Sequence, residues 1–142
     1  RFALPLLARA LGEHWAVAFA ANLGDALDMP ALHGRRFALA LLSYPLTHRY
    51  QIEMRWPEDV TIDGEPASSL WETEHFRLLT TRSVRGNTET RTVEFSAKVG
   101  EVPAGEALRF AADLAEVEAR VGGVMTASGQ RPDDATPRAD RP

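Results

Sequence analysis

The feature that most constrains the fold is the alternation in residues 50–56, YQIEMRW. Tyr50, Ile52, Met54 and Trp56 are apolar or aromatic, whereas the residues between them are polar or charged. Successive side chains of a β-strand point to opposite faces, so this pattern predicts a strand with one buried face and one face in water. We expect this strand to lie in an antiparallel sheet.

Two further strands are predicted over residues 73–84 and 90–99, with a turn at Arg85-Gly86-Asn87 between them. Gly and Asn tolerate positive φ, which favours an antiparallel hairpin, and we expect its loop to be longer than two residues. The side chains expected to face the core on these strands are Phe76, Leu78, Val93 and Phe95. Residues 36–42 form a short apolar run that is typical of a buried strand.

A helix is predicted from Pro103 to about Val121. Proline is tolerated at a helix start because its missing N–H would be unpaired there in any case. The predicted apolar stripe consists of Phe110, Leu114, Val117 and Val121. Two i,i+4 pairs, Arg109–Asp113 and Glu116–Arg120, are expected on the wet side.

A second helix is predicted from Glu13 to Pro30, because Trp15, Phe19, Leu23 and Leu27 recur every four residues. The predicted fold class is therefore mainly β (α+β): an antiparallel, β-sandwich-like domain with an N-terminal helical segment and a C-terminal helix packed on the sheet.

Three segments are expected along the chain. Residues 1–34 are an N-terminal segment of helix and linker, which belongs either to this domain or to the end of a preceding one. Residues 35–123 are the β-rich domain with its closing helix. Residues 124–142 are a disordered polar tail, because the sequence from Thr126 onward is rich in proline and polar residues. The chain begins at Arg1 without a basic-then-apolar leader, so we expect it to be a piece of a longer protein.

Composition excludes several classes of function. The net charge is -4 and the basic residues are scattered, which argues against a nucleic-acid surface. No apolar run approaches the roughly 18 residues that span a bilayer. Cysteine is absent, so the chain cannot form disulfides, thiolate metal sites or a cysteine nucleophile.

The residues that could carry chemistry form no recognisable motif. The histidines, which we interpret as surface or strand-edge residues and not as metal ligands, are His14, His33, His48 and His75. The adjacent carboxylate pairs, which we interpret as solvated, are Glu58/Asp59 and Asp133/Asp134. The serines Ser68, Ser69 and Ser83 lack a GxSxG motif, and no phosphate-binding glycine loop is present. We therefore predict no catalytic residue, no cofactor and no metal.

One aromatic residue remains open as a binding residue. Trp71 lies at a loop–strand junction and is a possible surface contact, whereas Tyr50 and Trp56 share the core face of their strand. Aromatic side chains at a groove suit a carbohydrate, lipid or peptide ligand.

Two stretches together resemble a known family: RRFALALLSYPLTHRYQIEMRWPED and FRLLTTRSVRGNTETRTVEFSAKVGEVPAGEALRFAADLAEV. Their order of strands, tyrosine-proline, valine-proline and helix resembles the C-terminal β-rich accessory domain of bacterial transglutaminase-like proteins, over residues 35–122. The resemblance implies a papain-like core with a Cys-His-Asp triad upstream, and a periplasmic or secreted location. No catalytic residue of that family transfers to this chain.

Three hypotheses follow. The first is a non-catalytic accessory domain of an exported transglutaminase- or protease-like bacterial protein, which packs on the catalytic domain or positions a protein or peptide substrate. The second is a stand-alone module that binds carbohydrate, lipid or peptide through Trp71 and nearby aromatic residues. The third is an independent hydrolase with a non-local His/Asp/Ser site, for which a pocket holding His48 or His75 beside a carboxylate would be the sign.

Overall fold

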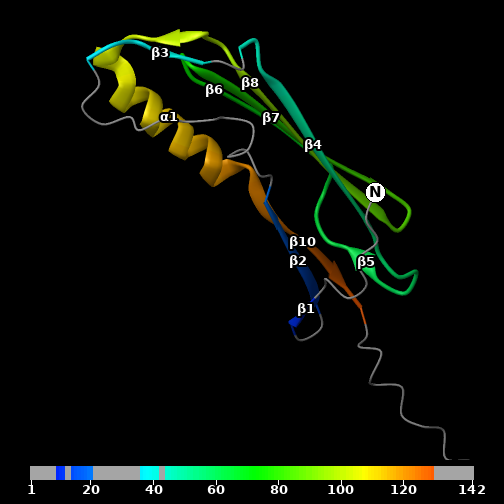
Figure 1. Cartoon of the computed structure of the whole chain (residues 1–142). Helices are drawn as coiled ribbons and strands as arrows, with labels where there is room; N and C mark the ends of the chain where they lie inside the picture. The colour runs from blue at the N-terminus through cyan, green and yellow to red at the C-terminus, as the bar shows by residue number, and fades with distance from the viewer. Residues whose placement is uncertain (1–8, 12–13, 21–35, 42–43, 130–142) are drawn as a thin grey trace, which may run out of the picture.

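The computed structural model describes residues 9–11, 14–20, 36–41 and 44–129 (Figure 1). Their strands form three antiparallel sheets. The large sheet has the order β4–β8–β7–β6, with β4 at Thr47–Arg55, β6 at Ala67–Glu72, β7 at Phe76–Arg85 and β8 at Thr88–Ala97. The small sheet has the order β1–β2–β10–β5, with β1 at Arg9–Leu11, β2 at His14–Ala20, β5 at Thr61–Ile62 and β10 at Gly122–Ser128. A third pair joins β3 (Leu39–Ala40) to β9 (Glu101–Val102).

The predicted closing helix is confirmed. A 3-10 turn at Ala104–Glu106 follows Pro103 and leads into α1 (Ala107–Arg120), which lies along one end of the large sheet (Figure 1). The helix buries Phe110 and Val117, while Leu114 is half-buried against the same core. The sheet side of this first core consists mainly of Phe76, Leu78, Val93 and Phe95. Burying such side chains stabilises the fold by roughly 1.5–3 kcal/mol each.

A second core lies at the other end of the large sheet, beneath the small sheet. Val17 of β2 and Met125 and Ala127 of β10 pack there against Trp56, which is 3% exposed. The same face of the large sheet is thus covered twice, by α1 at one end and by β2 and β10 at the other (Figure 1). α1 leads into β10 at Val121 and Gly122, and Val121 belongs to the first core.

The strands predicted from alternation are also confirmed. Ile52 and Met54 are half-buried on β4, whereas Glu53 and Arg55 are exposed. On β7 and β8 the four side chains expected to face inward are all buried. The mainly β, sandwich-like α+β class holds for the part of the chain that the structure describes.

The predicted N-terminal helix is wrong where it can be compared. Residues 14–20 form β2, which pairs with β10 from His14↔Ser128 to Ala20↔Gly122. Trp15, Val17 and Phe19 also alternate with alanines, so the same residues satisfy a strand pattern. Pairing with β10 supplies backbone hydrogen bonds along the whole strand. Leu23 and Leu27 lie outside the described residues.

The expected disordered tail is wrong for residues 124–128, because they belong to β10. Composition suggested a tail, yet Met125 and Ala127 alternate inward and are fully buried. The expected longer hairpin loop is also wrong, because Arg85 pairs directly with Thr88 and leaves a two-residue turn. Gly86 holds φ at +58° there, a conformation that favours glycine.

Two strands, β5 and β6, form in the stretch where proline, glycine and serine are typical of turns. Val60 and Ile62 reach the second core, as the sequence allowed, and β5 pairs with β10 beside them. Farther along, β6 pairs with β7 from Ala67↔Arg82 to Glu72↔Arg77, and forms one edge of the large sheet. β6 contains few β-branched residues, so its own sequence favours a strand weakly.

Candidate functional site

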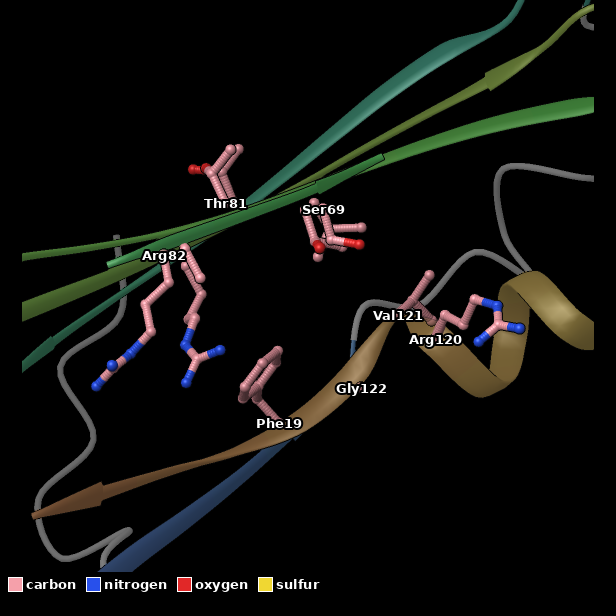
Figure 2. A pocket seen from close by; sticks show the side chains of 12 residues that line it. Phe19, Ser69, Thr81, Arg82, Arg120, Val121 and Gly122 are labelled. Atoms are coloured by element: carbon pink, nitrogen blue, oxygen red, sulfur yellow. The ribbon is translucent and has the colours of Figure 1, made fainter. Parts of the chain in front are cut away.

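The candidate site is a pocket between the large sheet and the α1–β10 junction (Figure 2). Its volume is about 120 Å³. The lining comes from β2, from β6, β7 and β8 of the large sheet, and from the junction of α1 with β10: Phe19, Ala67, Ser69, Thr80, Thr81, Arg82, Arg91, Thr92, Val93, Arg120, Val121 and Gly122. Figure 2 shows Arg82 and Phe19 pointing into the gap from opposite sides, whereas Thr81 points to the other face of the sheet.

Two arginines lie directly opposite each other on the floor of this pocket. The register of the β7–β8 hairpin pairs Arg82 with Arg91. Like charges opposite each other across two strands are unfavourable, so this pair needs an anion. Glu89, two residues before Arg91 on the same face of β8, supplies it: the Nε atoms of both arginines donate to its Oε1 at 2.7 Å.

Arg82, which lies on the strand next to the β6 edge, has a structural role. Arg82 is 8% exposed and also donates to the carbonyl oxygens of Glu65 (2.8 Å) and Asp63. These bonds hold the loop before β6 against the sheet. Removing one partner of such a buried pair leaves an uncompensated charge, which typically costs about 3–5 kcal/mol.

Arg91 is more exposed than Arg82 and makes fewer hydrogen bonds among the described residues. Its side chain is 28% exposed and lies 5.9 Å from the centre of the Phe19 ring. Among the described residues, its side chain hydrogen-bonds through Nε alone. Glu89 is fully buried, and its Oε2 atom has no hydrogen-bond partner among them. The pocket floor therefore carries two guanidinium groups against one shared carboxylate.

A third guanidinium group comes from the helix. Arg120, in the last turn of α1, lies 5.3 Å from the centre of the Trp71 ring and donates to Glu116 at 2.8 Å. The predicted Glu116–Arg120 pair is thus confirmed, and it lies beside the pocket. Trp71, the one predicted surface contact, is half-buried against the first core and has Arg120 over its ring.

The edge strand β6 forms another side of the pocket, and its side chains there are small. Ala67 and Ser69 face the same side of the sheet as Arg82 and Thr80, their partners on β7. Both are nevertheless exposed, although side chains on this face farther into the sheet are buried. The pocket therefore opens to solvent along β6.

Close approach of Phe19 to two glycines shapes the opposite wall. Phe19 of β2 pairs with Gly123 of β10, and a Cβ atom on Gly123 would lie 3.0 Å from the Phe19 ring. A Cβ atom on Gly122 would lie 3.1 Å from the Phe19 carbonyl oxygen. The Gly122-Gly123 pair, interpreted from the sequence as the helix end, thus also leaves room for Phe19 beside β10.

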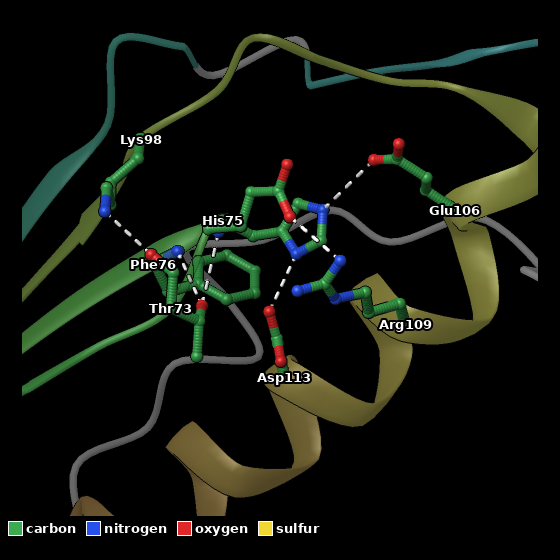
Figure 3. Close-up of polar contacts among 8 residues, drawn as sticks. Thr73, His75, Phe76, Lys98, Glu106, Arg109 and Asp113 are labelled. Atoms are coloured by element: carbon green, nitrogen blue, oxygen red, sulfur yellow. Dashed lines mark hydrogen bonds and ion pairs between the residues drawn. The ribbon is translucent and has the colours of Figure 1, made fainter.

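A second polar cluster surrounds His75, under the N-terminal half of α1 (Figure 3). Nδ1 of His75 lies 2.7 Å from Oδ2 of Asp113, and Nε2 lies 3.8 Å from Glu106. The expected surface position of His75 is wrong, because it is 2% exposed. The expected Arg109–Asp113 pair is also replaced: Asp113 turns inward, and Arg109 instead meets Glu74 at 3.1 Å.

This cluster contains a histidine paired with a carboxylate, and the histidine is buried under α1. The imidazole packs edge-on against the Phe110 ring, at 5.3 Å between centres, and does not line the pocket described above. The Thr73 hydroxyl oxygen accepts hydrogen bonds from the backbone N–H groups of His75 and Phe76. The geometry is that of a clamp between the β6–β7 turn and α1.

The third polar cluster joins β10 to β5. The hydroxyl of Ser128 donates to Oδ1 of Asp63, and Nδ1 of His14 lies 3.4 Å from Oδ2. The hydrogen bond from Ser128 is the main cause that lowers the pKa of Asp63 below its ordinary 3.8, and His14 and Thr126 act in the same direction, against the effect of burial. The cluster fixes the end of β10.

The remaining predicted residues do not converge. Glu58 and Asp59 are exposed in a turn, as interpreted from the sequence, and Ser68 and Ser83 are exposed on separate strands. His48 is half-buried on β4; His33, Asp133 and Asp134 lie outside the described residues. Within 9–11, 14–20, 36–41 and 44–129, no group of three or more acidic or histidine side chains could hold a metal ion. No helix there is long and apolar enough to cross a membrane.

Sequence reasoning missed the pocket because its members are ordinary arginines, serines and threonines on separate elements. The one available signal was the hairpin register, since a two-residue turn at Gly86-Asn87 places Arg82 opposite Arg91. Comparison with known proteins adds no relative: no protein-family model, no curated protein and no solved structure matches this chain.

Proposed function

We propose that this chain is a non-catalytic accessory domain that holds an extended segment of a protein substrate as an added strand on the edge of β6. The observation that carries the proposal is the exposed, one-sided pairing of β6. It is a six-residue edge strand, exposed at nearly every position, and among the described residues it pairs on one side with β7. Such an edge is a template for a further strand.

The backbone of β6 offers hydrogen-bonding groups at known positions. The Thr73 N–H donates to the Phe76 carbonyl at 2.9 Å, which marks these two residues as a hydrogen-bonded pair at the end of the β6–β7 ladder. Such pairs alternate along antiparallel strands. Ser69 and Trp71 therefore point their backbone groups toward β7, and Ser68 and Leu70 point theirs away from it.

The other edge of the large sheet is protected, and β6 is not. β4 carries Arg49, Glu53 and Arg55 on its exposed face. Charged side chains on an edge strand discourage pairing with another chain. β6 has a single charge, at its last residue Glu72, and its exposed face presents Leu70, which is 53% exposed. This asymmetry favours β6 as the docking edge.

The wider role rests on the sequence. The resemblance of residues 35–122 to the accessory domain of transglutaminase-like proteins supports a place beside a catalytic core in an exported bacterial protein. The absence of cysteine supports a role without a thiol nucleophile. A strand-binding edge gives such a domain a physical means of presenting an extended substrate segment to its neighbour.

The experiment is a selection of peptides on the purified chain, from a display library of random octapeptides, followed by comparison of two variants at Ser68. Ser68→Pro removes a backbone N–H that points away from β7, so the β6–β7 ladder stays intact. Ser68→Ala keeps that N–H and is the matched control. We expect selected peptides to bind wild type and Ser68→Ala equally and to lose at least about tenfold in affinity on Ser68→Pro.

Thermal melts of both variants separate loss of binding from loss of folding. Ser69→Pro serves as the reference for a broken ladder and should unfold at a lower temperature than Ser68→Pro. The proposal is overturned when no peptide is selected, or when Ser68→Pro melts like Ser68→Ala and still binds every selected peptide with unchanged affinity.

A further inference from the structure

We propose that the arginine pocket receives the carboxylate of an aspartate or glutamate side chain carried by the strand that docks on β6. This inference rests on the proposed function, and it names the chemistry by which the domain selects its partner. Three observations support it: the direction of side chains on an added strand, the space above β6, and the charge of the pocket.

The direction follows from sheet geometry. A strand added beside β6 lies about 4.8 Å from it, and its residues opposite Ala67 and Ser69 point to the same face as those two side chains. That face looks toward the small sheet and the α1–β10 junction, where Ala67 and Ser69 line the pocket. The residues of the docked segment opposite Ala67 and Ser69 are thus aimed at the pocket.

The space is set by small side chains. Ala67 and Ser69 rise little above the sheet, while Arg120 lines the helix side of the pocket and lies over the Trp71 ring. A pocket of about 120 Å³ is large enough for a short side chain and its head group, and too small for a folded partner or a sugar chain. An acidic side chain enters over Ser69, the residue of β6 between Ala67 and Trp71.

The charge selects the head group. Arg82, Arg91 and Arg120 line the pocket, and Glu89 is the carboxylate that binds two of them. Arg120 lines the pocket from the end of α1, with a side chain that is 46% exposed and paired with Glu116, which is itself 58% exposed. A guanidinium group offers five N–H donors in a planar fork that matches a carboxylate. Arg120 therefore has donors left for an incoming carboxylate, as does Arg91 below it.

The opposite face of the docked strand has a different preference. Leu70 pairs with Leu79 across β6 and β7 on the outer face, so the neighbouring position of an added strand meets an apolar surface. The expected recognition pattern is an acidic residue toward the pocket, flanked by apolar residues on the other face. An alternating segment of this kind suits strand pairing.

The test uses a peptide selected on the wild-type chain and its Glu→Gln or Asp→Asn counterpart, measured on wild type, Arg120→Gln and Arg109→Gln. Arg109 lies on the same helix, is 67% exposed and does not line the pocket, so its variant controls for net charge. On wild type and Arg109→Gln, the acidic peptide should bind at least about tenfold more tightly than its amide counterpart. On Arg120→Gln this preference should fall to about threefold or less.

Failure of this inference is distinct from failure of the proposed function. Peptides that depend on the Ser68 N–H but show no preference for an acidic residue overturn the pocket assignment and leave strand addition standing. The assignment is also overturned if Arg120→Gln and Arg91→Gln both keep the wild-type preference for the acidic peptide. The melting curve of Arg91→Gln shows that this variant is folded.

Discussion

Nδ1 of His75 lies 2.7 Å from Oδ2 of Asp113, which joins the β6–β7 turn to the middle of α1 (Figure 3). The imidazole is 2% exposed, so removing the Asp113 carboxylate takes the hydrogen-bond partner from a buried ring nitrogen. We expect Asp113→Ala to lower the free energy of unfolding by about 1–3 kcal/mol, the cost of a buried polar group left without a partner. Urea unfolding measures this loss. Glu118→Ala, an exposed change on the same helix, should stay within about 0.5 kcal/mol; an equally small effect of Asp113→Ala would contradict the clamp.

Met125 carries the prediction for β10. It is fully buried beneath the small sheet, whereas its neighbour Val124 is 53% exposed on the other face. Met125→Ala should cost about 2–5 kcal/mol through lost burial and the cavity left behind, and Val124→Ala should cost much less. Denaturant melts of the two variants test whether residues 122–128 belong to the folded domain. Equal and small effects would return this segment to the status of a tail.

Glu89 is the anion on which both arginines of the hairpin depend. Glu89→Ala leaves Arg82 and Arg91 opposite each other without their shared acceptor. We expect a loss of about 3–5 kcal/mol in the free energy of unfolding, because one side of a buried ion pair remains. Glu94→Ala, on the opposite face of β8, is the control in the same chemical denaturation series. A Glu89→Ala variant as stable as this control would mean that the arginines do not need the carboxylate.

Asp63 makes the stability of the fold depend on pH. Its pKa is lowered in the folded state, chiefly by the hydrogen bond from Ser128, so ionised Asp63 stabilises the fold at pH values above the unfolded pKa of about 3.8. That contribution is lost as the pH falls through the lower folded pKa. Asp63→Asn should therefore reduce the loss of stability between about pH 6 and about pH 2. Asp59→Asn, in an exposed turn, controls for charge; identical pH profiles for Asp63→Asn and wild type would contradict the assignment.

Local patterns predicted the elements whose own residues carry a clear period. β4 and the strands of the β7–β8 hairpin alternate with a period of two, and the buried residues of α1 follow the helical period. Residues 14–20 were misassigned because Trp15 and Phe19 fit a helical spacing as well as an alternating one. Their pairing with β10, more than a hundred residues away, decides between the two, and a single sequence does not display that partner.

The candidate site was beyond sequence reasoning for the same physical reason. Phe19, Ser69 and Arg120 meet through tertiary contacts among three elements, and none of the three belongs to a motif. The sequence predicts surface positions for His75 and Asp113, since nothing near either residue in the sequence indicates a partner 38 positions away. The hairpin register alone could have placed Arg82 opposite Arg91.

Residue-resolved amide hydrogen exchange with and without a selected peptide tests strand addition on β6 most directly. The account predicts slower exchange of the Ser68 and Leu70 N–H groups in the complex, because both point away from β7 and become hydrogen-bonded to the added strand. Protection at Gln51 on the β4 edge should stay unchanged. Slowed exchange on β4, or unchanged exchange at both β6 positions while the peptide is bound, would contradict the account.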